Sequence, residues 1–313
     1  MQLGKATREA YGEALAALGA EMPEVVVLDA DLSKSTMSKK FADKFPDRFF
    51  NMGISEANMI GVASGLAACG KVPFASSFAT FLICKGFDQL RMSVAYQGEN
   101  VKCCGTHAGI SIGEDGVSQQ GIEDLALACA LNGFTVLVPA DEAEMRAAVK
   151  AAALHKGPVY IRAGRPKAPI IYPDGKAEFV IGKADTVRAG TDVTVIGIGL
   201  LVGAAVDAAE ALAAEGLSVR VINMACIKPL DADAIVVAAQ ETGAIVVAEE
   251  HINHGSLGQA VAQVVAANCP VPMGFVNIGD RYAESGTPDE LMVKYGLTAN
   301  DVAAAVRAVA KRK

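Results

Sequence analysis

Val25-Val26-Val27-Leu28-Asp29 is the stretch that decides the fold class of this chain. Four consecutive apolar residues leave no polar face, which is typical of a parallel strand covered by helices on both sides. Similar short runs follow at Val72 to Ser76 and at Val101 to Cys104. Because helix-forming segments separate these runs, the sequence predicts a parallel α/β sheet with helices on both faces.

The same alternation extends outward from this run through the first half of the chain. Thr7 is expected to cap the first helix. The pattern predicts helices over residues 7–19, 55–66, 87–96, 122–131 and 142–154, and strands over 25–28, 72–76, 101–104, 134–138 and 159–161.

The alternation stops between Lys167 and Asp192, where prolines and glycines replace the long apolar runs. We therefore expect a first domain over residues 1–170, a linker over 171–190 and a smaller second α/β domain over 191–313. The second domain is expected to contain strands over 193–198, 219–223, 244–247 and 276–278, and helices up to residue 214, over 258–267 and over 301–311.

Composition and charge exclude several classes of protein. Of the 313 residues, 52% are hydrophobic and 20% charged, and the net charge is −7. An acidic chain without a basic run before Lys311 is not expected to bind nucleic acid or an anionic membrane. Seven scattered cysteines and the absence of an apolar leader or membrane span predict a cytoplasmic protein with reduced thiols.

Two features of the first domain point to a buried ligand site. Glu56 starts a helix of small apolar residues, where a carboxylate either serves chemistry or is simply an acid favoured by the helix dipole. Phe78 and Phe81 follow the strand at Val72, and two rings there either form a wall for a flat ligand or belong to the ordinary core.

Polar residues and glycines are concentrated between Thr106 and Gln119. This segment follows a buried strand, so it should lie at the carboxyl edge of the sheet, where open α/β sheets bind ligands. Arg162 and Arg165 also follow a strand, and guanidinium groups at that edge suit a phosphate. The alternatives are a turn-rich loop and solvated surface charge. His251 and His254 are interpreted as solvated loop residues, and no metal site is expected in this chain.

Taken in order, these segments resemble transketolase over essentially the whole chain. The Ser111-to-Gly116 segment, followed by Gln119, is the most specific of them. The other matching segments are Ala6-Thr7-Arg8, Leu28-Asp29-Ala30-Asp31, Ser35-Thr36, Gly53 to Met59, Ser77 to Phe81, Phe87 to Arg91 and Ile227 to Asp231. The resemblance implies a pyrimidine-binding domain for thiamine diphosphate, followed by the smaller carboxy-terminal domain of the family.

The resemblance also implies a partner chain. Full-length members carry a diphosphate-binding domain with a Gly-Asp-Gly motif, and this motif does not occur here. We therefore expect an N-terminal transketolase subunit to supply that domain and to bind the Mg²⁺ or Ca²⁺ ion that holds the cofactor diphosphate. The expected activity is transfer of a two-carbon ketol unit between sugar phosphates, with no activity for this chain alone.

The resemblance assigns roles to individual residues. Glu56 is expected to bond the cofactor pyrimidine and activate it, Phe81 to stack on the pyrimidine ring and Phe78 to support it. His107 is expected to line the channel and to take part in catalysis, and Asp115 to bind a substrate hydroxyl. Arg8, Ser35 and Arg165 are expected to hold the sugar phosphate, and Gln119 occupies a position where many microbial members have histidine.

Three other classes of protein share parts of this pattern. The β-type subunit of a 2-oxoacid dehydrogenase, or a deoxyxylulose phosphate synthase relative, would share Glu56 and the domain order, and a non-catalytic binding subunit could keep the same fold. The Gly113-to-Gly116 loop and the pair of Arg8 and Arg165 favour transketolase.

We expect a heterotetramer with the partner, self-association as a dimer, and close helix packing through Ala57, Gly61, Ala63 and Gly65.

Overall fold

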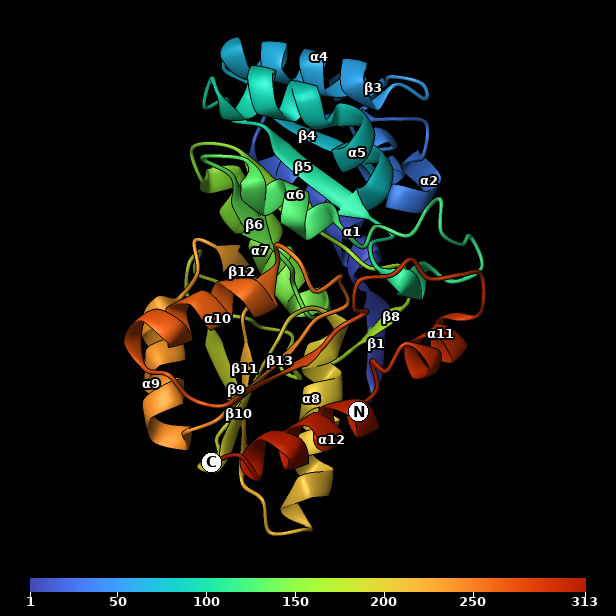
Figure 1. Cartoon of the computed structure of the whole chain (residues 1–313). Helices are drawn as coiled ribbons and strands as arrows, with labels where there is room; N and C mark the ends of the chain where they lie inside the picture. The colour runs from blue at the N-terminus through green and yellow to red at the C-terminus, as the bar shows by residue number, and fades with distance from the viewer.

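Two mostly parallel sheets, each with helices on both faces, form the framework of the chain (Figure 1). The structure is a computed structural model and describes residues 1–313. The first sheet has seven strands in the order β12-β6-β7-β5-β4-β2-β3. In chain order, the strands of the first unit are β2 (Val25–Asp29), β3 (Phe49–Asn51), β4 (Val72–Phe78), β5 (Lys102–Thr106), β6 (Thr135–Leu137) and β7 (Val159–Arg162).

The apolar run of β2 is buried on both sides, as its sequence predicts. Val25 and Val27 pack with α1 (Thr7–Glu21) and α7 (Glu142–Leu154) on one face. Leu28 packs with the other face, which is covered by α4 (Glu56–Ala68), α5 (Ala79–Gln89) and α6 (Asp124–Ala130). The short helices α2 (Ser33–Thr36) and α3 (Lys39–Ala42) follow β2.

The second unit repeats this arrangement on a smaller sheet, in the strand order β14-β13-β10-β11-β9. Helices α8 and α12 contribute to the core on one face, and α9 and α10 to the core on the other. The elements are β9 (Asp185–Arg188), β10 (Val193–Gly197), α8 (Leu200–Ala213), β11 (Val219–Asn223), α9 (Ala232–Thr242), β13 (Ile245–Ala248), α10 (Leu257–Asn268), β14 (Met273–Val276), α11 (Pro288–Lys294) and α12 (Ala299–Ala310).

Several short elements connect the two units. Strand β12 (Cys226–Lys228) follows β11 in the chain but pairs antiparallel with β6 of the first sheet. Strand β1 (Leu3–Ala6) pairs antiparallel with β8 (Lys167–Pro169), and the amino group of Met1 lies 3.0 Å from the Asp207 carboxylate on α8. The two units therefore share backbone pairing as well as side-chain contacts.

The structure corrects the expected start of two helices. α5 begins at Ala79, eight residues before the expected Phe87, and passes into a π-helical turn at Leu90–Ala95. Ala6, not Thr7, is the N-cap residue of α1. The Thr7 hydroxyl instead accepts a hydrogen bond from the Gly164 amide at 2.8 Å, because this helix start lies against the end of β7.

The strand expected over residues 276–278 begins and ends earlier in the chain than predicted. β14 spans Met273–Val276, because its pairing with β13 runs from Met273 to Val276. Strand β9 lies within residues 171–190, and its polar, half-exposed residues give no apolar run that sequence reasoning could detect.

Fewer of the small residues of α4 share one exposed face than the sequence predicts. A Cβ atom added to Gly61 or Gly65 would meet nothing within 4 Å, so both glycines face open space. Ala63 is fully buried in the core and does not belong to that face, because it lies on the opposite side of the helical turn. Val62, next to Gly61 in the helix, is an exposed apolar residue.

No helix of the structure is both long enough and apolar enough to cross a lipid bilayer.

Candidate functional site

The residues singled out in the first domain gather at the carboxyl edge of the first sheet. Phe78 ends β4, His107 follows β5 and Arg165 follows β7. Arg8 lies in the first turn of α1 and Ser35 in α2, which follows β2. Because the strands that precede these groups are parallel, their ends meet on one side of the sheet.

Glu56 is the first residue of α4 and is only 2% exposed. Its carboxylate accepts one hydrogen bond, from the Ser77 hydroxyl to Oε1 at 3.2 Å. Oε2 lies 3.5 Å from the ammonium group of Lys85, which is itself half exposed. Oε2 accepts no hydrogen bond within the chain and remains available to a further donor.

Three aromatic side chains stack beside this carboxylate. The rings of Phe78 and Phe81 are 5.8 Å apart and nearly parallel, with an interplanar angle of 15°. The His107 ring also stacks on Phe78, with the ring centres 3.9 Å apart and an interplanar angle of 25°. The Lys85 ammonium lies 4.5 Å from the centre of the Phe81 ring, so a single cation reaches both Phe81 and Glu56.

His107 is held as a neutral, buried imidazole. Its backbone adopts a left-handed conformation, with φ at 58°, and the residue is 3% exposed. Burial, together with the positive charges of Arg8 and Arg165, lowers its pKa to about 3. The Thr106 hydroxyl lies 3.4 Å from the Ser77 carbonyl and 2.9 Å from His107 Nδ1. The low pKa leaves one ring nitrogen unprotonated and able to accept a hydrogen bond.

Arg8 and Arg165 form the cationic side of the site. Arg8 Nη1 donates to the Ser35 backbone carbonyl at 2.8 Å, and its Nε donates to the Arg165 carbonyl at 3.4 Å. The Ser35 hydroxyl is not the group that contacts Arg8. The Arg8 guanidinium is thus bonded to the backbone of the segment that carries Arg165, and two guanidinium groups from neighbouring segments suit a phosphate.

Arg165 already has acidic neighbours in the loop between β5 and α6 (residues 107–123, called here the β5–α6 loop). Its Nη1 donates to the Ile112 carbonyl and, at 3.1 Å, to Glu114. Asp115 lies 3.8 Å from the same nitrogen. Both carboxylates are largely exposed, so an incoming phosphate would compete with partners that water already screens.

Gln119 lies in the β5–α6 loop, and His251 and His254 lie in the second domain. The half-buried Gln119 side chain makes no hydrogen bond, and only its backbone amide donates, to Gly116 at 3.0 Å. His254 is exposed in a loop, as expected, whereas His251 is completely buried. The interpretation of His251 as a solvated residue was therefore wrong, because its ring packs against α6 and its Nε2 faces the Ala126 amide at 3.4 Å.

Sequence reasoning missed three side chains that shape the site. Lys85 follows Phe81 by one helical turn, a spacing that would have indicated it had α5 been placed correctly. Ser77 precedes Phe78 at the end of β4 and bonds Glu56. The buried Asp29 accepts hydrogen bonds from Leu32, Thr36 and Ser38 and so fixes the turn that carries Ser35; burial raises its pKa to about 6.

The site suits one end of a flat, nitrogen-containing ring. The buried Glu56 carboxylate can accept a hydrogen bond from a ring N–H. The Phe81 ring beside it can stack on the ligand ring. The Lys85 ammonium occupies the point where such a ring would meet both groups. The structure contains no cluster of three or more His, Cys, Asp or Glu side chains arranged to hold a metal ion.

Comparison with known proteins identifies the family of both domains. The profile of the transketolase pyrimidine-binding domain matches residues 4–170, and that of the transketolase C-terminal domain matches residues 182–302. The 6-deoxy-6-sulfo-D-fructose transketolase subunit SqwH of Clostridium sp. (strain MSTE9) is 41% identical over 306 residues, covering 98% of this chain and 95% of the relative.

Two further relatives differ in how much of their own length this chain covers. Human transketolase is 40% identical over 306 residues, but this chain spans only 48% of its length. A solved split-gene transketolase, described as an inactive β4 tetramer, superposes with a TM-score of 0.92 at 50% identity, covering 99% of this chain and 100% of that one.

Proposed function

The chain belongs to the transketolase family, and on that premise we propose that it is the subunit that binds the pyrimidine end of thiamine diphosphate in a two-chain transketolase. The observation that carries this proposal is the shared position of the Lys85 ammonium, 3.5 Å from Glu56 and 4.5 Å from the Phe81 ring centre. An aminopyrimidine ring requires a carboxylate that accepts its hydrogen bond and an aromatic ring on which it can stack. Glu56 and Phe81 both face this one position.

Glu56 would hold and polarise the pyrimidine of the cofactor. When bound, thiamine diphosphate supplies an electron sink for cleavage of a carbon–carbon bond next to a carbonyl group. Glu56 Oε2 would accept a hydrogen bond from a ring nitrogen and favour the protonated ring, while Ser77 holds the opposite oxygen. The half-exposed Lys85 can leave this point without a cost in core packing.

The remaining residues would bind a sugar phosphate beside that ring. The unprotonated ring nitrogen of His107 would accept a hydrogen bond from a substrate hydroxyl. Asp115 would bind a further hydroxyl, and Arg8 and Arg165 would hold the phosphate. Ser35 and Gln119 would line the same channel, Ser35 through the turn that supports Arg8.

A partner subunit would complete the site. We propose that it brings the diphosphate-binding domain with its Gly-Asp-Gly motif and the Mg²⁺ or Ca²⁺ ion. The inactive β4 tetramer of the related split-gene transketolase supports both self-association of such a chain and its inactivity without a partner. The exposed face of α4 around Gly61, Val62 and Gly65 is our candidate for the contact between two copies.

Reconstitution tests the proposal directly. The purified chain is mixed with a transketolase N-terminal subunit, thiamine diphosphate and Mg²⁺, and transfer from a ketose phosphate to an aldose phosphate is followed. Wild-type chain should give turnover, and the Glu56→Gln variant, which keeps the size of the side chain, should not. A stable wild-type complex that decarboxylates a 2-oxoacid but transfers no ketol unit would overturn the assignment.

A further inference from the structure

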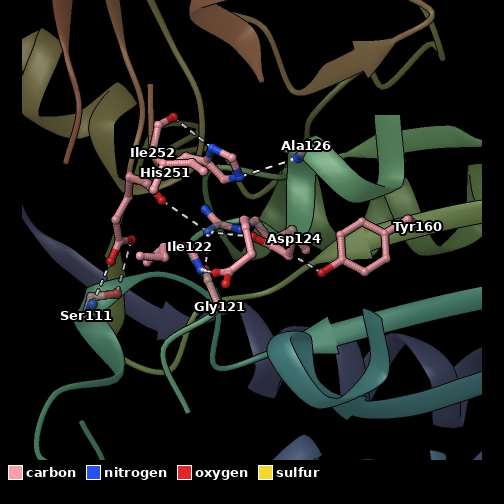
Figure 2. Close-up of polar contacts among 12 residues, drawn as sticks. Ser111, Gly121, Ile122, Asp124, Ala126, Tyr160, His251 and Ile252 are labelled. Atoms are coloured by element: carbon pink, nitrogen blue, oxygen red, sulfur yellow. Dashed lines mark hydrogen bonds and ion pairs between the residues drawn. The ribbon is translucent and has the colours of Figure 1, made fainter. Parts of the chain in front are cut away.

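The β5–α6 loop carries His107 and Asp115. The second domain contacts this loop and holds it in place. Figure 2 shows Ser111 of this loop facing a carboxylate that comes from the segment after β13. That carboxylate belongs to Glu250, which is 5% exposed. Its Oε1 accepts the Ser111 amide at 2.6 Å, and its Oε2 accepts the Ser111 hydroxyl at 3.2 Å. Both oxygens are therefore committed to one residue of the loop.

Gly109 shows how closely the loop backbone approaches this carboxylate. Its φ of +81° lies in the left-handed region, and a Cβ atom at this position would come within 2.2 Å of the Glu250 carboxyl carbon. A side chain at position 109 is thus excluded twice, by conformation and by the carboxylate. The loop and Glu250 are fitted to one another rather than merely adjacent.

Arg162 ties the carboxyl end of the same loop to the same segment. Its guanidinium donates to the Gly121 carbonyl at 2.9 Å and to the backbone carbonyl of Glu250 at 3.1 Å (Figure 2). It also forms a buried ion pair with Asp124 at 2.9 Å, and Tyr160 donates to that carboxylate at 2.8 Å. These charge-assisted bonds close the base of the loop against the second domain.

Further contacts from the second domain follow the loop along its length. The Gln120 side chain donates to the Glu284 carbonyl at 2.9 Å, and the Ile252 amide donates to the Ile122 carbonyl at 3.1 Å. A Cβ atom on Gly113 would lie 2.9 Å from the Pro288 ring. In Figure 1 the blue-green loop after β5 lies against the red segment that leads into α11.

From this arrangement we infer that Glu250 is a positioning residue, through which the second domain holds the β5–α6 loop in the conformation that presents Asp115 and the Ile112 carbonyl to the substrate side. Ser111 is adjacent to Ile112, whose carbonyl accepts from Arg165. Fixing Ser111 therefore also fixes the partner that orients Arg165. This inference rests on the proposed function for its catalytic consequence, but the hold on the loop is a property of the chain itself.

Glu249 provides a matched control for the experiment. It is the neighbouring residue, it is 2% exposed, and its carboxylate also accepts two backbone amides, from Leu257 at 3.1 Å and Gly258 at 2.8 Å. Those amides begin α10, inside the second domain. Removing Glu249 should therefore cost comparable stability and leave the β5–α6 loop in place.

The first measurement is hydrogen–deuterium exchange of the full chain without any partner. We expect Glu250→Ala to speed exchange in peptides covering residues 109–118 at least tenfold. Ser111→Ala, which removes only the hydroxyl bond, should have a smaller effect and covers the case that Glu250→Ala does not fold. Glu250→Gln, which keeps an acceptor for the amide, should lie between them. Glu249→Ala should speed exchange at the start of α10 alone.

The second measurement uses the reconstituted complex. Glu250→Ala should raise the KM for both sugar phosphates about tenfold, the effect of losing a bond to a charged group, and leave deuterium exchange at the cofactor's thiazolium carbon within twofold of wild type. Unchanged loop exchange in both Glu250→Ala and Ser111→Ala would overturn the inference, as would parallel losses of every activity in the Glu249 and Glu250 variants. A wild-type complex without ketol transfer would overturn only the proposed function, because loop exchange is measured independently of it.

Discussion

Glu56 is the group on which the proposed chemistry depends most. It is buried, it lies at the N-terminus of α4, and one of its oxygens is already held by Ser77. The other oxygen meets only the flexible Lys85 ammonium. This combination keeps the carboxylate ordered while leaving one acceptor for a ligand.

Replacing Glu56 by Gln should abolish activation of the cofactor while the fold is retained. The amide keeps the volume of the side chain but cannot supply the negative charge that polarises the pyrimidine. We expect deuterium exchange at the thiazolium carbon of the reconstituted complex to fall by about 10²–10⁴-fold, the range for loss of a positioned acid or base. Exchange at the wild-type rate would exclude the assigned role.

Arg165→Ala should weaken phosphorylated sugars far more than unphosphorylated analogues. Loss of a charge-assisted bond is worth roughly 1.5–3 kcal/mol, which is about 10- to 150-fold in KM. Steady-state kinetics with both kinds of substrate measure the difference. An equal loss for both kinds would mean that Arg165 serves only to hold Ile112 and the acidic loop residues.

The depressed pKa of His107 should make the chain less stable in mild acid. The folded pKa is about 3, against about 6.5 for an unfolded histidine. Between these values the unfolded state binds a proton that the folded state does not, so stability is present above pH 6.5 and falls as the pH is lowered.

The contribution from His107 can be isolated by a difference measurement. Between pH 7 and pH 5, wild type should lose about 2 kcal/mol more unfolding free energy than His107→Asn. Urea unfolding of both proteins at the two pH values measures this. The same pH slope in both proteins would show that His107 is not kept neutral.

Helix α4 carries two of the proposed features on one element. Its first residue is Glu56, and its outer face holds Gly61 and Gly65, both with open space before them. An exposed helix containing two glycines and an apolar Val62 is poorly suited to solvent but well suited to close contact with another helix. The proposed contact between copies would thus lie on the helix that carries the catalytic carboxylate.

The double substitution of Gly61 and Gly65 by Glu tests this contact. Each change removes a helix-interior glycine, so the isolated chain should become more stable, by up to about 1 kcal/mol per site. Self-association measured by sedimentation equilibrium should weaken strongly, because two charges would be buried between copies. Ala211→Glu on the exposed side of α8 serves as the control. Unchanged association in the double variant would remove α4 from the contact.

Most long apolar runs were predictable, but helix α9 and several short elements were not. β2 and α7 were located from sequence because burial on two faces, or a regular helical period, leaves a strong pattern. β9 and β12 were missed because three or four residues at a sheet edge carry little pattern, and the pairing of β12 with the first sheet is a long-range contact. The early start of α5 placed Phe81 on a helix and brought Lys85 into the site.

Candidate site residues could be named from the sequence more readily than their contacts. Strand ends and clustered polar residues indicated His107, Asp115 and Arg165 from sequence. The left-handed backbone of His107 and the hold of Glu250 on Ser111 depend on segments that are distant in sequence. No local pattern can reveal such contacts, since they form only when the two domains pack together.

At the scale of the whole molecule, the proposed function places half of an active site at the edge of the first sheet. Glu56 and Phe81 would form its pyrimidine side, and Arg8 and Arg165 its phosphate side. The second domain lies behind the β5–α6 loop and holds it through Glu250. The proposed partner would supply the diphosphate-binding half, and two chains of each kind would form the heterotetramer.

Titration of the chain with its proposed partner tests this central claim most directly. Ketol transfer is measured at a fixed concentration of the rigorously purified chain, with thiamine diphosphate, Mg²⁺ and increasing N-terminal subunit. The account predicts no turnover without the partner and a rate that rises until the two chains are equimolar, because each site needs one chain of each kind. Turnover by the chain alone at the rate of the saturated mixture would contradict it.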